Sequence, residues 1–176
     1  MDLVDRYLGE MERVLRAISR DEVRRAVAAL FDAWRWRKTV WVVADGGILA
    51  SYLADELHRM TVVPGQPSLH AARFVEQVST LSAGDVVVAL ATTGDCENVL
   101  RAATRAKDVG ALTLALRGLS GGALAGVADL SVMAPAERAS QQDDAYTMIV
   151  HLIAGSLRER IELDAVTAAN ASAVAQ

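Results

Sequence analysis

Apolar side chains follow two kinds of spacing along this chain, one typical of helices and one typical of buried strands. Near the start they recur every three or four residues, which predicts one amphipathic helix, at Leu3, Val4, Tyr7, Leu8, Met11, Val14, Leu15 and Ile18. A second helical stripe contains Val23, Val27, Leu30, Phe31 and Trp34. Ser19 and Glu22 stand just before it with the spacing of a capping box. We therefore expect residues 1–36 to form a helical arm that belongs to the same domain as the rest of the chain.

After this arm, short continuous apolar runs alternate with further helical patterns. The predicted strands are residues 39–44, 61–63, 85–91, 111–116 and 130–133. The predicted helices are residues 48–60, 70–82 and 96–109, a short turn within 118–127, and a long helix from about 141 to 163. Pro-Gly-Gln-Pro at 64–67 predicts a turn. Strands that alternate with helices predict an α/β fold, with a five-stranded parallel sheet covered by helices on both faces.

Composition limits the classes of partner. The chain has 176 residues, 52% of them hydrophobic, which predicts one domain with a large core. The net charge of −4 argues against nucleic acid as the main partner. The single cysteine fits a reducing cytoplasm, and no apolar run reaches the roughly 20 residues that span a membrane. We expect a cytoplasmic protein without a signal peptide, with a flexible tail at 166–176.

Two turns that follow neighbouring strands carry candidate chemistry. Gly46 and Gly47 follow the first strand in a tight turn, for which a purely structural role is the alternative. The turn at 91–97 carries two hydroxyls and a glycine before a helix begins. There Thr92, Thr93 and Gly94 could bind an anion with the backbone N–H groups of residues 94–97.

Acidic side chains in the second turn leave another interpretation open. Asp95 and Glu97 could cap the helix themselves and repel a phosphate, so that no ligand binds. Cys96 stands at the start of the same helix, where a thiol pKa can fall, but its acidic neighbours act in the opposite direction. We expect a chemically quiet cysteine rather than a nucleophile.

A carboxylate and an imidazole on two helices form the second candidate group. Glu56 lies on the helix after the first turn, and His151 lies on the long late helix. Asp143 and Asp144 precede His151 by about two helical turns. If these side chains converge, they could transfer protons beside a carbonyl or hold a divalent metal such as zinc. A hydrogen-bonded core histidine is the alternative for His151.

Several segments resemble the sugar isomerase (SIS) domain family, specifically its phosphoheptose isomerase type. Ala-Thr-Thr-Gly-Asp-Cys-Glu-Asn-Val-Leu at 91–100 is similar to the family's Ser-Thr-Ser-Gly-Asn-Ser-x-Asn-Val. Ala-Leu-Thr-Leu-Ala-Leu-Arg-Gly from Ala111 and Gly-Gly-Ala-Leu-Ala-Gly-Val-Ala-Asp up to Asp129 continue the likeness. Glu56 in Ala-Asp-Glu-Leu matches the family's Ala-Ala-Glu-Leu, and His151 in Val-His-Leu matches a family histidine.

The resemblance implies a fold, an assembly and a reaction. It implies a flavodoxin-like three-layer sandwich, with an SIS domain over 37–165, in a homo-oligomer that is a dimer or a tetramer. It implies a sugar phosphate bound at the sheet edge and at subunit interfaces, and proton transfer by Glu56 and His151 between C1 and C2 of sedoheptulose 7-phosphate. No resident cofactor is implied with certainty, although some members bind a metal such as zinc. The implied substrate-binding residues are Gly46, Gly47, Thr92, Thr93, Gly94, Asp95, Cys96, Asn98 and Asp143.

The chain departs from the family pattern in both turns. The first turn is about two residues shorter, and Ala91 and Cys96 stand where the family has serines. Tyr52 replaces a histidine that binds metal in some members, and Asp143 replaces a glutamine. A second class of function therefore remains open. The chain could be a non-catalytic SIS protein that acts through its oligomeric surface, as does a relative that binds the bacterial replication initiator.

Overall fold

The computed structural model describes residues 2–45, 47–74 and 80–174, which form a sheet with helices on both sides. The helices are α1 (Leu3–Ala17), α2 (Arg20–Arg35), α3 (Gly47–Met60), α4 (Glu97–Val109), α5 (Leu124–Val127) and α6 (Ala139–Val174). The strands are β1 (Thr39–Ala44), β2 (His70–Arg73), β3 (Val86–Ala91), β4 (Leu112–Arg117) and β5 (Leu130–Met133).

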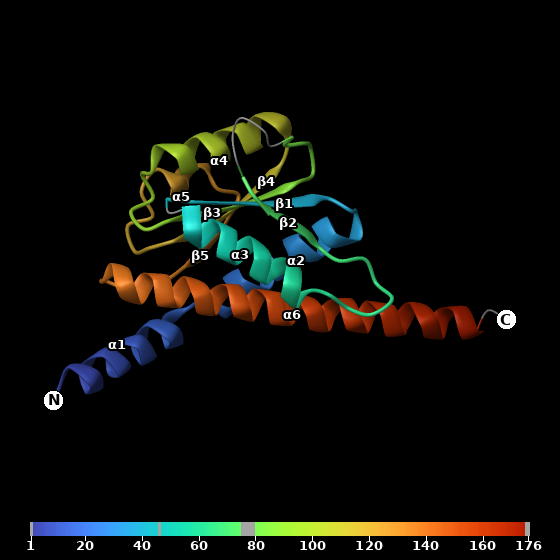
Figure 1. Cartoon of the computed structure of the whole chain (residues 1–176), viewed down its shortest axis with the longest axis horizontal. Coiled ribbons are helices and arrows are strands. Elements are labelled where there is room, and N and C mark those ends of the chain that lie inside the picture. Colours follow the sequence, from blue (N-terminus) through green and yellow to red (C-terminus); the bar gives the residue numbers. More distant parts are fainter. Residues whose placement is uncertain (1, 46, 75–79, 175–176) are drawn as a thin grey trace.

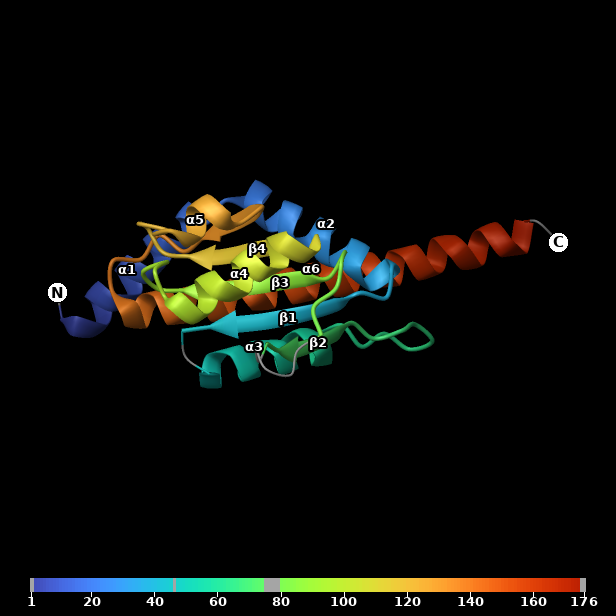
Figure 2. The ribbon, with the colours of Figure 1, turned by 90° about the horizontal axis from the view of Figure 1, so that it is seen from above.

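The sheet is parallel throughout, with the strand order β2-β1-β3-β4-β5. Helices α4 and α5 cover one face, and α2, α3 and α6 cover the other (Figures 1 and 2). All six residues of the central strand β3 are buried, as expected for a strand with helices on both faces. The predicted α/β three-layer sandwich with five parallel strands is confirmed, and the strand order is that of flavodoxin-like folds.

Parallel pairing brings the turns that follow β1 and β3 to the same edge of the sheet. These strands are direct neighbours, with Ala44 paired opposite Leu90. The amide of Asp45 donates a hydrogen bond to the carbonyl of Leu90 at 3.3 Å, so the first turn begins beside the end of β3. The two candidate turns therefore lie at one sheet edge, as the sequence predicts.

The prediction for residues 61–82 is wrong in two places. Residues 61–63 form no strand, because the hydroxyl of Thr61 donates to the carbonyl of Leu57 at 2.7 Å and closes the end of α3. The second strand is β2, within the segment predicted to be helical; residues 75–79 of that segment lie outside the described residues. The turn at 64–67 is confirmed by a hydrogen bond from the amide of Gln66 to the carbonyl of Val63 at 3.1 Å.

The helical arm is divided between the core and the surface. Ser19 accepts a hydrogen bond from the amide of Glu22, as a capping box predicts, but the Glu22 carboxylate accepts from the amide of Met133 and so ties α2 to β5. Helix α1 contacts α6 through a hydrogen bond from the hydroxyl of Tyr7 to Asp144. Leu3, Val4 and Leu8 on α1 remain exposed.

Helix α6 is longer than the sequence predicts. It continues to Val174 instead of ending near Leu163, so residues 166–174, within the segment predicted to be a flexible tail, are helical (Figure 1). Alanine-rich sequence favours a helix, and this intrinsic preference outweighs the lack of an apolar stripe in the last turns. Within the described ranges, no helix combines the length and the apolar character needed to cross a bilayer.

A buried carboxylate joins the other ends of β1 and β3. Asp85 is 5% exposed and accepts hydrogen bonds from the amide of Thr39 at 3.0 Å, the indole N–H of Trp41 at 3.1 Å and the amide of Ser82 at 3.0 Å. Charged acceptors form stronger hydrogen bonds than neutral ones, and each buried donor that loses its partner costs free energy. Asp85 therefore fixes the start of the central strand.

We expect Asp85→Ala to lower the free energy of unfolding by about 3 kcal/mol, because three donors lose their acceptor. Chemical denaturation followed by circular dichroism measures this change. Asp108→Ala, an exposed substitution on α4, is the control and should change stability little. A loss at Asp85 no larger than the loss at Asp108 would show that these hydrogen bonds add no net stability.

Candidate functional site

Glu56 and His151 meet where α3 packs on α6. The Glu56 carboxylate oxygen Oε1 lies 3.3 Å from Nε2 of His151, and the hydroxyl oxygen of Tyr52 lies 3.4 Å from the same nitrogen. Glu56 is only 7% exposed, whereas the His151 side chain is 42% exposed. The structure thus brings together the two residues that the sequence analysis singled out for proton transfer. A buried carboxylate beside a solvent-accessible imidazole can give and receive protons.

Arg59 holds the Glu56 carboxylate from the next turn of α3. Its Nη2 lies 2.6 Å from Oε1 and 2.7 Å from Oε2 of Glu56, and its Nε lies 3.2 Å from Oε2. Buried carboxylates require such compensation. Both carboxylate oxygens are therefore paired in this state, and the side chain is held in one orientation. The sequence analysis did not identify Arg59.

A concavity of about 430 Å³ opens over this pair. It is lined by Glu56, Arg59, Met60, His151 and Arg158, all from α3 and α6. Two arginines and one carboxylate give this surface a positive balance. The concavity can therefore receive an anionic molecule next to a proton donor and acceptor.

The loop between β3 and α4 packs closely on the loop that precedes α5. Gly94 has φ +80, and a Cβ atom there would overlap the carbonyl of Gly121. The carbonyl of Gly94 also accepts a hydrogen bond from the amide of Leu124 at 2.9 Å. Only glycine fits this position, because the backbone there has a positive φ and the opposite carbonyl leaves no room for a side chain. The predicted close backbone approach at Gly94 is thus made to another loop of the chain.

Asp95 does not cap its own helix, contrary to the self-capped interpretation. The N-cap of α4 is Cys96, which makes no side-chain capping hydrogen bond. The Asp95 carboxylate instead accepts from the amide of Ala123 at 2.9 Å, and its own amide donates to the hydroxyl of Thr93 at 3.4 Å. Packing between the two loops, which no local pattern encodes, selects this partner. The side chain of Asp95 therefore leaves the first amides of α4 uncovered.

The other predicted binding residues lie around the same edge of the sheet. The Asp45 carboxylate accepts from the amide of Thr92 at 3.2 Å, just before the amides of residues 94–97 that were predicted to bind the anion. Gly46 lies outside the described residues, and Gly47 is the first residue of α3. Asn98 accepts a hydrogen bond from Arg101 on the surface of α4. Cys96 is a half-buried free cysteine.

Carboxylates gather near the start of α6. Partial burial, followed by the negative charges of Asp45 and Asp144, raises the pKa of Asp143. The side chain of Gln142, one residue earlier, donates to the carbonyl of Thr92 at 3.2 Å and to the hydroxyl of Tyr146 at 2.7 Å. Gln142, rather than Asp143, thus contacts the β3–α4 loop directly.

Tyr146 lies beneath this loop, within the core. Its hydroxyl donates to the carbonyl of Ala91 at 3.2 Å, at the end of β3. Burial raises the pKa of Tyr146, and the nearby charges of Asp45 and Asp143 act in the same direction. Tyr146 therefore stays protonated and supports the loop as a neutral donor.

Zinc does not fit the residues present. Among the described residues, no three histidine, cysteine, aspartate or glutamate side chains lie close enough together to hold a metal ion. Both oxygens of Glu56 face Arg59, and the neighbouring group on the same face of α3 is the phenol of Tyr52, which is no imidazole or carboxylate donor. Tetrahedral zinc sites need three or four such donors. No step of the chemistry below therefore involves a metal.

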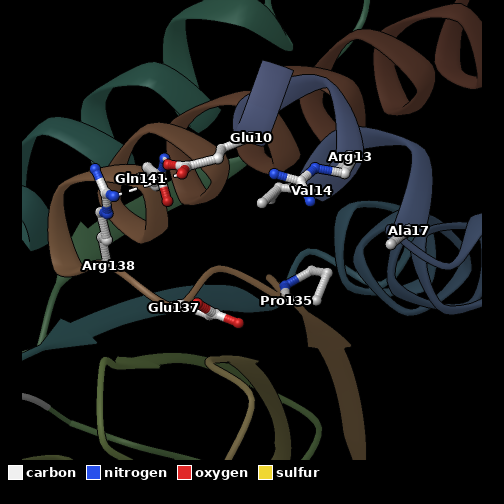
Figure 3. A pocket seen from close by; sticks show the side chains of 8 residues that line it. All are labelled: Glu10, Arg13, Val14, Ala17, Pro135, Glu137, Arg138 and Gln141. Atoms are coloured by element: carbon white, nitrogen blue, oxygen red, sulfur yellow. Dashed lines mark hydrogen bonds and ion pairs between the residues drawn. The ribbon is translucent and has the colours of Figure 1, made fainter. Parts of the chain in front are cut away.

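A second concavity, of about 290 Å³, lies between α1 and the start of α6 (Figure 3). Glu10 closes one side of it, with an oxygen 2.7 Å from Nε2 of Gln141 and another 3.4 Å from Nη2 of Arg138. Val14, Ala17 and Pro135 supply its apolar lining. None of the residues predicted for substrate binding or proton transfer lines it.

We expect Asp143→Asn to raise the melting temperature at pH 7. Folding raises the pKa of Asp143, so the native state binds more protons than the unfolded state between the two pKa values, and stability falls as the pH rises through that interval. Asparagine carries no charge at this position, so the variant does not lose stability as the pH rises. Melting curves at pH 7 and at about pH 3, below the ordinary carboxyl pKa, should show the gain only at pH 7. An equal gain at both values would contradict the electrostatic cause, and Asp108→Asn is the surface control.

Known proteins resemble this chain in sequence and in fold. It is 35% identical over 88 residues to a probable phosphoheptose isomerase of Thermoplasma acidophilum, across 49% of this chain and 48% of that protein. It is 27% identical over 108 residues to a phosphoheptose isomerase of Helicobacter pylori, across 61% and 56%. The chain spans about half the length of the curated relatives it matches.

Solved structures share the fold over most of the chain. A phosphoheptose isomerase from Neisseria gonorrhoeae superposes with a TM-score of 0.75 at 19% identity, covering 89% of this chain and 97% of that one. The Vibrio vulnificus NanR protein complexed with ManNAc-6P superposes with a TM-score of 0.69 at 18% identity, covering 98% and 68%. The family model of the SIS domain matches residues 43–157. This chain therefore belongs to the SIS domain family.

Proposed function

We propose that this chain binds a phosphorylated sugar and interconverts its aldose and ketose forms, as a phosphoheptose isomerase does with sedoheptulose 7-phosphate. The observation that carries the proposal is the 3.3 Å contact between Glu56 and His151 on facing helices. The contact lies in a concavity with Arg59 and Arg158, which suits an anionic sugar. Relatives named phosphoheptose isomerase, and a structural neighbour complexed with ManNAc-6P, support this class of ligand.

The proposed reaction moves one proton between neighbouring carbons of the sugar. Glu56 takes the proton from the carbon next to the carbonyl, and the electron pair left behind forms an enediol double bond while the carbonyl oxygen becomes a hydroxyl. His151 supplies the proton to that oxygen and takes one from the neighbouring hydroxyl as the new carbonyl forms. Glu56 then returns its proton to the adjacent carbon. Atoms and charge balance, and no oxidant is needed.

A second function, in which the chain binds a partner protein and catalyses nothing, is favoured by the charges at the sheet edge. The Asp45 carboxylate accepts a hydrogen bond from the amide of Thr92. Asp95 and Asp143 add negative charge around the same β3–α4 loop. Like charges repel a phosphate there. In this alternative the inherited scaffold acts through its oligomeric surface.

We expect Glu56→Gln and His151→Ala each to lower the turnover of sedoheptulose 7-phosphate by about a thousandfold, the usual contribution of a general acid or base. A coupled assay for the isomerised sugar, with the full chain, measures this. Asp108→Asn, which changes an exposed carboxylate at the far end of α4, should keep wild-type turnover.

The same set of proteins separates the two functions. Absence of turnover in the wild type, together with no thermal shift from any sugar phosphate, would support the regulatory alternative. If both variants turn over sedoheptulose 7-phosphate at the wild-type rate, Glu56 and His151 take no part in the reaction.

We also propose that the chain forms a homo-oligomer, a dimer or a tetramer, in the cytoplasm. Leu3, Val4 and Leu8 on α1 are each 63% exposed, and Leu152 on α6 is 51% exposed. Apolar side chains repeated along one helix commonly mark an interface between subunits. A second copy packed on α1 would bury these side chains. The single, half-buried cysteine is compatible with a reducing compartment.

We expect Leu8→Glu to dissociate the oligomer, because a charge in an apolar interface must be desolvated without a partner. Light scattering coupled to size-exclusion chromatography measures the mass of the wild type and of the variant. Glu12→Gln, on the same helix, is the control and should keep the wild-type mass. A wild type that elutes as a monomer at all concentrations would refute the proposed assembly.

A further inference from the structure

The β3–α4 loop, or anion loop (residues 92–96), lies among carboxylates. Asp45 accepts a hydrogen bond from the amide of Thr92, and Asp95 lies within the loop. Partial burial, followed by the charges of neighbouring carboxylates, raises the pKa of Asp143 beside it. A phosphate monoester carries up to two negative charges near neutral pH. The loop therefore binds such an ion only if a positive charge close by offsets these carboxylates.

Arg117, the last residue of β4, carries a positive charge beside the start of the anion loop. It pairs directly with Ala91, the last residue of β3 before the loop. Paired residues of neighbouring strands point to the same face of a sheet, and Ala91 packs in the part of the core that α4 and α5 cover. The side chain of Arg117 therefore lies on the face toward which the anion loop turns to enter α4.

Gly121 links Arg117 to the anion loop. A Cβ atom on Gly121 would lie 3.1 Å from Cδ and Nη1 of Arg117, and the carbonyl of the same glycine is the group that approaches Gly94. The charge of Arg117 also reaches the start of the loop. Burial raises the pKa of Tyr146, whose hydroxyl donates to the carbonyl of Ala91, and the positive charge of Arg117 opposes this rise.

The guanidinium of Arg117 has no counterion among the described residues. Within residues 2–45, 47–74 and 80–174, its buried Nε has no hydrogen-bond partner, and no carboxylate forms an ion pair with it. Its Nη1 donates one long hydrogen bond, of 3.4 Å, to the carbonyl of Gly118. A half-buried charge without a partner costs free energy, which a bound anion would offset. Other arginines of the chain do pair with a carboxylate, among them Arg16, Arg24, Arg59 and Arg158.

We propose that Arg117 supplies the countercharge for a phosphate that the backbone amides of the anion loop bind. The inference rests on the proposed function and names the side chain that lets an acidic loop bind an anionic substrate. Residues 94–97 provide the N–H donors, which remain uncovered because Asp95 accepts from Ala123 instead. Arg117 acts on the phosphate through its charge, from the neighbouring strand. A guanidinium stays protonated at every pH at which proteins are folded, so this countercharge is permanent.

The test compares Arg117→Met with Arg117→Lys in the full chain, because both side chains are long and only lysine keeps the charge. Calorimetry measures the affinity for inorganic phosphate and for sedoheptulose 7-phosphate. We expect Arg117→Met to weaken both about tenfold or more at low salt, the effect of removing one charge near a dianion. Arg117→Lys should keep most of the affinity. Arg117→Gln, which is neutral but polar, repeats the comparison should the methionine variant fold poorly.

Two further measurements distinguish binding from a structural role of Arg117. In the turnover assay, Arg117→Met should raise KM and leave kcat nearly unchanged, because the phosphate keeps its charge in the ground state and in the transition state. The melting temperature without ligand should change by no more than about 3 °C, since the Nε atom that is lost has no hydrogen-bond partner among the described residues.

Arg24→Met is the matched control. Arg24 is an exposed arginine of α2 that pairs with Asp21 at 2.7 Å, and the variant changes the net charge of the chain by the same amount. It should bind both ligands as the wild type does. A fall in affinity equal to that of Arg117→Met would show an effect of net charge alone and overturn the proposal.

The remaining outcomes separate this inference from the proposed function. Unchanged phosphate affinity in Arg117→Met, or an equal loss in Arg117→Lys, would overturn the inference and leave the isomerase reaction in place. Weaker binding in Arg117→Met, with no turnover by the wild type, would support the role of Arg117 and overturn the isomerase. A wild type that binds neither ligand would overturn both.

Discussion

The burial of β3 on both faces is the constraint from which the rest of the arrangement follows. A strand of six buried residues, Val86–Ala91, requires a layer of helices on each side of the sheet. Right-handed crossovers between parallel strands then place α3 on the same face as α2 and α6. This packing brings Glu56 into contact with His151, although they are far apart in the sequence. The contact between the two candidate proton-transfer residues therefore depends on the helix layer that the buried strand requires.

Periodicity predicts the fold well where an element buries a full face. The predicted strands at 39–44 and 130–133 match β1 and β5 residue for residue. Strand β2 escapes prediction because it lies at the sheet edge and pairs only with β1, so His70–Arg73 needs no continuous apolar run. The segment at 61–63 resembles a strand through its β-branched side chains, but the hydroxyl of Thr61 is committed to the end of α3.

The sequence anticipated the proximity of Glu56 and His151 from residue type and position, and the resemblance matched the same two residues, but the contacts that depend on packing were missed. The arginines beside this pair were not identified. Arg59 follows Glu56 by three residues and Arg158 follows His151 by seven, a helical spacing visible in the sequence. This spacing gains meaning only once α3 and α6 are known to be neighbours that run in parallel. In the same way, Asp95 had two helix starts within reach, and only the packing of the loops assigns it to Ala123.

The contact between Gly94 and Gly121 has a consequence for how this chain can vary. Both residues have a positive φ, and a side chain on Gly94 would overlap the opposite backbone. The backbones of the two loops are therefore in direct contact, and Gly94 cannot gain a side chain unless the opposite loop shifts. Variation in this part of the chain is thus confined to the residues around the two glycines, which set how far the anion loop and its supporting loop can diverge.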